Sequence, residues 1–213
     1  NMVIDTGTRC FIRGCVASSC RDKNILVITS NYCRIINSSG LSSVNEDGIV
    51  IYGTNIGCFA IGCEALSNPR VGLAVGGTLG NQLVGCQASL NAYGLNISGD
   101  SVCIIGCSSE YNTGCGILVD AGTKGGSIEG GFIFGNSGLG IQLQGPRVDI
   151  KIVGVQVRQN GAGGASNGGI GLVTSGGSGP QRVTIDSCLI LDNNPNGLIM
   201  QLGGNHQIIG CTF

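Results

Sequence analysis

The stretch 102–120, VCIIGCSSEYNTGCGILVD, contains three short apolar segments separated by Gly or Asn, and most of the chain repeats its pattern. If Cys107 is taken as position zero, equivalent positions recur after 21 to 25 residues, with one longer interval of 33 residues. A repeat of about 20–50 residues indicates a solenoid or an array. The equivalent positions are Cys15, Ser38, Cys63, Cys86, Cys107, Gly131, Val155, Cys188 and Cys211.

Each repeat contains three segments in which apolar residues occupy alternate positions, which is typical of strands with one buried face. No segment carries a helical apolar stripe longer than one or two turns. The first segment is expected to point Ile12, Ile35, Leu83, Ile104, Ile128, Ile152, Ile185 and Ile208 inward, and the second Ala65, Ala88, Ser109, Ile133, Val157 and Ile190. The third is expected to bury the pairs Ile25/Val27, Ile49/Ile51, Leu73/Val75, Leu95/Ile97, Ile117/Val119, Ile141/Leu143 and Leu198/Met200.

Strands this short cannot bury an inner face singly, so we expect them to stack in parallel on the same strands of neighbouring repeats, ~4.8 Å apart. Parallel crossover connections are right-handed in nearly all proteins. The sequence therefore predicts an all-β chain, a right-handed parallel β-helix of about eight to nine rungs with three short strands each. Residues 1–213 are expected to form one domain, a fragment cut in mid-rung at both ends.

An asparagine stands five residues after position zero in six consecutive repeats. Asn tolerates the left-handed backbone of a tight bend, and stacked amides can hydrogen-bond along a column. A general preference of Asn for turns would not hold one offset through six repeats. We therefore predict a structural column of Asn68, Asn91, Asn112, Asn136, Asn160 and Asn193.

Twelve cysteines in a small secreted chain would suggest disulfides. Most of them share two registers, position zero and five residues before it, and at position zero Gly and Val replace Cys in other repeats. This interchange indicates small buried residues, so reduced thiols are expected, with some disulfides as the alternative. Cys20, Cys103 and Cys115 fall outside both registers and are expected nearer to the surface.

Composition argues against several classes of function. The net charge is −1 without any basic run, which disfavours a nucleic-acid partner. No apolar run reaches the ~18–20 residues of a membrane span. The single histidine, His206, lacks the partners of a triad or a multi-His metal site, so it is expected to be a hydrogen-bonded stacked residue. The Gly-rich segments lack the Lys and Ser/Thr of a phosphate loop, and we expect no cofactor and no metal.

The repeat φ-x-G-C-x-x-x-x-N-x-x-x-G-φ-x-φ, in which φ is apolar, resembles the right-handed β-helix repeats of the pectin-lyase-like superfamily. Within that superfamily it looks most like the β-helix domains of bacteriophage tailspikes. The resemblance implies a virion tail protein, a homotrimer that binds a bacterial surface polysaccharide and often hydrolyses it. The Asn-Thr-Asp, Gly-His-Gly and Arg-Ile-Lys motifs of polygalacturonases are not found, nor is the Arg-x-x-Pro-x-x-Arg motif of pectate lyases. A secreted polysaccharide lyase, hydrolase or epimerase, or a purely structural shaft, remains the alternative.

Two carboxylates are candidates for glycoside hydrolysis. In inverting enzymes the two carboxyl groups lie about 6.5–9.5 Å apart. Glu129 and Asp186 share an outward register two rungs apart, with Val153 between them, so their backbones should lie roughly 9–10 Å apart. Charges that only solvate the surface are the alternative reading. The candidate substrate-binding residues are Lys151, Arg158, Arg182 and Glu110.

Two further features suggest where partners bind. The long interval contains the Gly/Ser-rich segments 160–169 and 174–181, which are either a binding site or a tolerated insertion. Outward apolar residues suggest contact with other copies of the chain, or cover by flanking segments. These residues are Phe132, Phe134, Leu189 and Leu191 on two strands, and Leu26, Val50, Ala74, Leu118 and Ile199 on the third strands.

Overall fold

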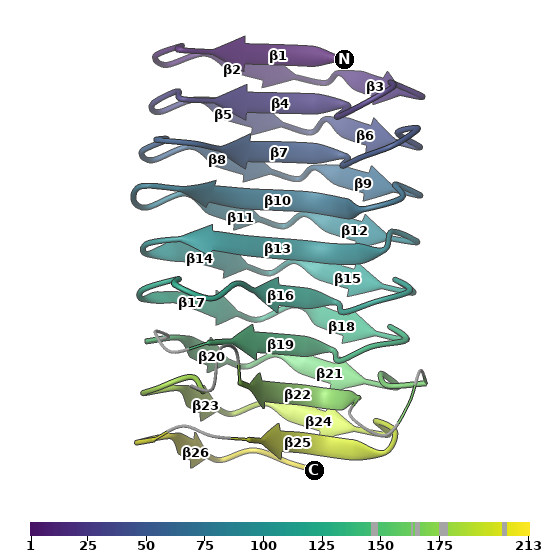
Figure 1. The fold of residues 1–213 in the computed structure, drawn as a ribbon, viewed down its shortest axis with the longest axis vertical. Coiled ribbons are helices and arrows are strands. Elements are labelled where there is room, and N and C mark those ends of the chain that lie inside the picture. Colours follow the sequence, from purple (N-terminus) through teal and green to yellow (C-terminus); the bar gives the residue numbers. More distant parts are fainter. Residues whose placement is uncertain (146–148, 163, 165–166, 175–178, 202–203) are drawn as a thin grey trace.

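The computed structural model describes residues 1–145, 149–162, 164, 167–174, 179–201 and 204–213. Within these residues the chain is all-β and forms a right-handed parallel β-helix of about eight turns. The turns stack along one axis from the N-terminus to the C-terminus, and each adds strands to three parallel sheets (Figure 1). The predicted fold class is confirmed.

We call the three sheets sheet 1, sheet 2 and sheet 3, and each contains every third strand of the chain. In the described residues sheet 1 contains nine strands, β1 (Met2–Asp5), β4 (Ile25–Ile28), β7 (Ile49–Tyr52), β10 (Val71–Gly77), β13 (Tyr93–Gly99), β16 (Ile117–Val119), β19 (Ile141–Gln144), β22 (Gly168–Val173) and β25 (Asn196–Met200).

Sheet 2, over the same part of the chain, also contains nine strands, β2 (Phe11–Arg13), β5 (Arg34–Ile36), β8 (Phe59–Ile61), β11 (Gln82–Val84), β14 (Val102–Ile105), β17 (Gly126–Glu129), β20 (Lys151–Val153), β23 (Thr184–Asp186) and β26 (Gln207–Ile209). Sheet 3 contains eight described strands, β3 (Val16–Ser18), β6 (Ser39–Leu41), β9 (Glu64–Leu66), β12 (Gln87–Ser89), β15 (Ser108–Glu110), β18 (Phe132–Phe134), β21 (Gln156–Arg158) and β24 (Leu189–Leu191).

The core consists of columns of aliphatic side chains along the helix axis. Leu83 pairs with Ile104, and Ile104 with Ile128, so the inward residues of successive turns lie one above another. All three are about 1 % exposed. Three predicted core residues are not fully buried, because β25 and β26 are the last strands of their sheets and pair on one side only: Leu198 is half-buried, Met200 is 53 % exposed and Ile208 is 41 % exposed.

The longest turn contains one strand that the sequence analysis does not assign. Strand β22 lies between the two Gly/Ser-rich segments and pairs with β19 and β25 in sheet 1. Gly168 and Gly169, which were predicted to belong to a loop, are its first two residues, whereas Ile170 and Leu172 point into the core. Residues 163, 165–166 and 175–178 of the two predicted loops lie outside the described residues.

The asparagine column is a continuous hydrogen-bonded ladder. From Asn91 to Asn193, each Oδ1 accepts hydrogen bonds from both the backbone N–H and the side-chain amide of the Asn one turn earlier. At Asn91 both donors belong to Asn68, and both distances are 2.9 Å. Asn24, which was not predicted, extends the ladder by donating to Asn68 Oδ1 at 3.1 Å. The ladder therefore fixes the bend between sheets 3 and 1 from turn to turn, as predicted.

All twelve cysteines are free thiols. The prediction that Cys115 lies near the surface is wrong: it is 6 % exposed, and its Sγ donates a hydrogen bond to Gln142 Oε1 at 2.7 Å. Cys20 is half-buried and occupies the Asn position of its own turn, where its N–H donates to Asn24 Oδ1 at 3.3 Å. It therefore belongs to a third column that the sequence analysis did not connect with Cys.

Candidate functional site

The two carboxylates predicted as a catalytic pair lie in the register expected of them. Glu129 ends β17 and Asp186 ends β23, and each pairs with Val153 of β20, which lies between them. Glu129 is exposed, and Asp186 is half-exposed and accepts a hydrogen bond from Ser187 Oγ at 2.8 Å. Lys151 begins β20, two residues before Val153, and its exposed side chain is on the same face.

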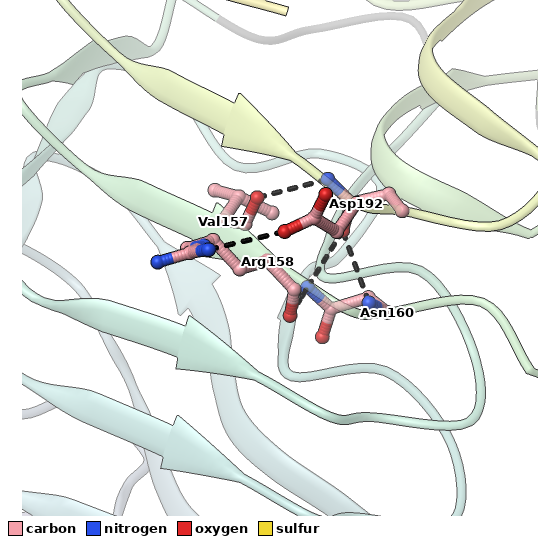
Figure 2. Close-up of polar contacts among 5 residues, drawn as sticks. Val157, Arg158, Asn160 and Asp192 are labelled. Atoms are coloured by element: carbon pink, nitrogen blue, oxygen red, sulfur yellow. Dashed lines mark hydrogen bonds and ion pairs between the residues drawn. The ribbon is translucent and has the colours of Figure 1, made fainter.

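The other predicted substrate-binding residues do not join this pair in one site. Arg158 and Glu110 are on sheet 3, both in register with Phe134. Figure 2 shows that Arg158 faces the carboxylate of Asp192, with Nη2 to Oδ2 at 3.0 Å. Arg182 forms two hydrogen bonds with Asp149, at 2.5 and 2.6 Å. The two arginines are thus already neutralised by aspartates of their own chain.

A groove that the sequence analysis did not predict crosses sheet 1. It runs from Lys23, just before β4, over β7, β10 and β13 to Asp120, just after β16. Its volume is about 270 Å³. The outward side chains of these strands form its floor, so it extends over five successive turns, or about 19 Å at the strand spacing of a sheet. Neither Glu129 nor Asp186 lines it.

Charged residues line one end of this groove. Glu46 accepts a hydrogen bond from Lys23 Nζ, and Arg70 Nη1 lies 3.7 Å from its other carboxylate oxygen. The hydrogen bond with Lys23, together with both positive charges, lowers the pKa of Glu46 below its ordinary value. Asp47 is 6 % exposed, and its Oδ1 accepts a hydrogen bond from Val71 N–H at 3.0 Å. This end of the groove is therefore an ordered network of opposite charges.

The other end contains a half-buried carboxyl group beside neutral hydrogen-bonding groups. Burial raises the pKa of Asp120, and a hydrogen bond with the Asn96 side chain offsets part of the rise. Gly76 lets the neighbouring side chains pack closely here, because a Cβ at this position would lie 2.5 Å from Ser98 Oγ and 3.4 Å from the Tyr52 ring. The Tyr52 ring is 62 % exposed and lines the same groove. Together these groups offer donors, acceptors and an apolar ring surface to a bound molecule.

Apart from Val50 and Ala74, which belong to the predicted outward apolar column, the groove residues were missed because no local motif marks them. Tyr52, Gly76, Ser98 and Asp120 are consecutive members of one outward column along sheet 1, and they lie 22 to 24 residues apart in the sequence. The outward register itself could have found them, because it places Gly76 between the aromatic Tyr52 and the polar residues Ser98 and Asp120.

Partly exposed apolar residues gather on sheet 3, as predicted. The rings of Phe132 and Phe134 stack at 5.3 Å, and Tyr111 contacts Phe134 edge-on at the same centroid distance. Leu189 and Leu191 lie two turns further along in the same two columns. The predicted stripe on sheet 1 is less continuous, because Asn96, Gln142 and Gly171 interrupt the column of Leu26, Val50, Ala74, Leu118 and Ile199, and Val50 is only 4 % exposed.

His206 lies in the column five residues before position zero, and its Nδ1 accepts a hydrogen bond from Val183 N–H at 3.3 Å. Burial lowers its pKa. Across the described residues, no three side chains of His, Cys, Asp or Glu are arranged to hold a metal ion. The described part of the chain also contains no helix long and apolar enough to span a membrane.

Comparison with known proteins agrees with this architecture. The family model of the right-handed β-helix region matches residues 47–213, which is most of the chain. A search of curated proteins gives no match. A β-helix domain of this kind fits a polysaccharide-binding or a structural role. The repeat, the three parallel sheets and this match together show that the chain belongs to the right-handed β-helix family.

Proposed function

We propose that this protein binds a polysaccharide along the groove of sheet 1. The observation that carries the proposal is the groove itself, a hollow that extends over five turns with an exposed tyrosine ring and both donors and acceptors along its floor. Sugar chains present hydroxyl groups at their edges and apolar C–H surfaces on their faces. Aromatic rings pack against the latter, and side-chain amides, hydroxyls and carboxylates hydrogen-bond to the former.

The kind of polysaccharide binder that the sequence most resembles is a bacteriophage tailspike. On this proposal the protein is part of a virion tail, forms a homotrimer and binds a bacterial surface polysaccharide, and a secreted β-helix enzyme acting on polysaccharides is the alternative. The apolar side chains of sheet 3, centred on Phe132 and Phe134, are the surface that we assign to contact between copies.

Polysaccharide binding can be tested on a glycan array with one variant in the groove and one outside it. Tyr52→Ala removes an exposed ring from the groove, and we expect it to weaken binding roughly tenfold, as for other aromatic contact residues. Tyr93→Ala is the control, because it removes an exposed ring, 41 %, that does not line the groove. An array with no bound glycan would leave the structural role, and equal losses in both variants would remove the groove from consideration.

Hydrolysis is a separate part of the proposal and rests on Glu129 and Asp186. Replacing them as Glu129→Gln and Asp186→Asn keeps side-chain size and removes the acid and the base of an inverting mechanism. We expect reducing ends to appear when the unmodified protein acts on a glycan that it binds, and to be abolished in both variants. Unchanged turnover in either variant would exclude the pair, and no turnover by the unmodified protein would leave binding alone.

The proposed trimer has its own measurement, multi-angle light scattering. The double change Phe132→Ser and Phe134→Ser exposes hydroxyls on the assigned contact face, and we expect it to convert a trimer into monomers. Leu79→Ser is the control, since Leu79 is 50 % exposed but lies outside sheet 3. A monomeric unmodified protein would favour the secreted-enzyme alternative.

A further inference from the structure

A second hollow lies on sheet 2. Its lining residues belong to the first two turns of the β-helix. It is lined by Arg9, Phe11, Tyr32 and Arg34, none of which lines the groove of sheet 1. Its volume is about 320 Å³. Phe11 is 62 % and Tyr32 54 % exposed, so both rings are accessible to a ligand. The hollow therefore combines two guanidinium groups with two accessible rings.

The register of sheet 2 holds one of these guanidinium groups in place. Phe11 pairs with Arg34, and Arg34 pairs with Phe59, so a cation lies between two aromatic residues of neighbouring turns. Arg34 Cζ is 5.6 Å from the Phe11 ring centroid and 5.9 Å from the Phe59 ring centroid. These contacts orient the planar group without neutralising its charge. The N–H groups of Arg34 can therefore donate hydrogen bonds to an anion.

The backbone positions the other two residues. Arg9 N–H donates to Asn31 O at 2.9 Å, which ties the turn that carries Arg9 to the turn that carries Tyr32. The Tyr32 ring lies on Gly57 of the next turn, where a Cβ would be only 3.1 Å from the ring. The Tyr32 ring and the Arg34 guanidinium are therefore held by contacts between turns before any ligand arrives, and the backbone of Arg9 is tied to the same turns.

The charge of this hollow is not balanced within the described chain. None of its lining residues is acidic, and neither Arg9 nor Arg34 takes part in any of the ion pairs formed among the described residues. This sets the two residues apart from Arg158 and Arg182, each of which faces an aspartate. Two unpaired guanidinium groups beside apolar rings are suited to an anion that is attached to a largely apolar body.

We propose that this hollow binds an acidic sugar residue, with the guanidinium groups of Arg9 and Arg34 on its anionic group and the rings of Phe11 and Tyr32 against its sugar ring. A carboxylate or a sulfate can accept two parallel N–H bonds from one arginine. This inference rests on the proposed polysaccharide function for the kind of ligand, and it adds an acidic substituent and a second site outside the groove.

The test uses three polymers that share one backbone: dextran, carboxymethyl-dextran and dextran sulfate. At physiological salt, where contacts between exposed charges are screened beyond about 8 Å, the unmodified protein is expected to bind at least one anionic polymer and not dextran. Comparison of the two anionic polymers shows whether carboxylate or sulfate is preferred. No binding of either anionic polymer, or equal binding of dextran, would overturn the inference.

Variants separate a built site from general charge attraction. Arg9→Gln and Arg34→Gln are each expected to weaken binding of the anionic polymer by roughly tenfold or more, whereas Arg21→Gln, which removes the same charge from an exposed position on the same turns, should leave it unchanged. Arg34→Lys keeps the charge but lacks the planar fork, so it should also weaken binding. Equal losses in all variants, or full binding by Arg34→Lys, would contradict a specific site.

The two sites fail independently in these experiments. If Tyr52→Ala reduces glycan binding and Arg34→Gln does not, the groove is supported and the acidic-sugar site is wrong. If the anionic polymer depends on Arg34 and no array glycan depends on Tyr52, the acidic-sugar site is supported and the groove is wrong. Melting temperatures of all variants, which should match that of the unmodified protein, exclude unfolding as the cause.

Discussion

Asn112 shows how one buried amide connects three turns of the helix. Its Oδ1 accepts hydrogen bonds from the Asn91 backbone N–H at 2.9 Å and from the Asn91 side chain at 3.2 Å. Its own Nδ2 donates to Asn136 Oδ1 at 2.8 Å and to Ser109 Oγ at 3.0 Å. Because the residue is fully buried, water cannot replace these partners. At the scale of the residue, much of the specificity of the fold depends on such amides.

The first prediction concerns this residue. Asn112→Ala would leave the buried Asn91 N–H without a partner, at a cost of about 1–3 kcal/mol, whereas Asn136 Oδ1 would lose one of its two donors and keep the backbone N–H of residue 112. We expect the free energy of unfolding to fall by about 1–3 kcal/mol in denaturant titration. Asn45→Ala, at an exposed turn position, is the control and should change it by less than about 0.5 kcal/mol. Similar losses in the two variants would contradict the role assigned to the ladder.

Asp120 gives a prediction about pH. Its pKa is raised from 3.8 by burial, so the folded protein holds this proton to a higher pH than the unfolded chain does. Below that range both states are protonated and the group contributes nothing to the pH dependence. As pH rises from about 4 through the raised pKa, the unfolded state releases its proton first, and stability falls.

The Asp120→Asn variant cannot ionise, so it should lack this loss of stability. We expect its melting temperature, relative to that of the unmodified protein, to increase between pH 4 and neutral pH. Asp22→Asn, which removes an exposed carboxyl group, should show no comparable change. A constant difference between Asp120→Asn and the unmodified protein across this range would show that burial does not perturb Asp120.

At the scale of the element, the strands of sheet 1 begin at closely packed glycines. A Cβ on Gly94 would lie 2.5 Å from Gly116 O and 2.8 Å from Asn112 Nδ2, atoms of the next turn that cannot move without breaking the sheet or the Asn ladder. Gly72 and Gly140 have similar surroundings in their own turns. These glycines allow the bend from sheet 3 to pass close to the following strand.

Substitution of one of them tests this view of the bend. Gly94→Ala is expected to lower the free energy of unfolding by about 1–3 kcal/mol through overpacking. Gly204→Ala is a matched control, because a Cβ at position 204 meets no atom within 4 Å. Calorimetry of both variants measures the difference. Equal melting temperatures would show that neighbouring turns can move apart to accept a Cβ at residue 94 with little loss of stability.

At the scale of the whole molecule, the stacked turns bury most thiols together with the aliphatic core. Seven cysteines are buried and five are half-buried. Burial raises the pKa of Cys115 to about 11, and a hydrogen bond with Cys86, together with burial, raises the pKa of Cys63. A raised pKa lowers the thiolate fraction, and the thiolate is the form that reacts.

Labelling with a thiol reagent therefore has a defined expected result. In the native protein Cys10, Cys15, Cys20, Cys103 and Cys211 should react first, and the buried seven should react only when the helix unfolds. All twelve should react in denaturant without prior reduction. Fewer than twelve reactive thiols in denaturant would show that disulfides form between neighbouring turns. Mass spectrometry of the labelled peptides identifies each group.

The sequence by itself determined the fold, because the repeat places equivalent residues at one offset and parallel stacking is the only way in which strands so short bury an apolar face. Three features follow from the constant spacing of the repeat: the inward Ile column, the Asn ladder, and the outward register shared by Glu129 and Asp186. The third strand of the long turn was missed because the surplus residues on both sides of Ile170 hide the offset. Cys115 was misplaced because its burial comes from neighbouring turns and not from its own register.

Only the tertiary structure decided where the outward side chains form hollows. The groove at Tyr52, Gly76 and Asp120, and the hollow at Arg9 and Arg34, each draw on residues from at least two turns and depend on side-chain directions and on ion pairs. A repeat specifies which residues share a column, since that depends on spacing along the chain. It does not specify which cations have an acidic neighbour or which outward side chains line a hollow, because these depend on contacts across turns.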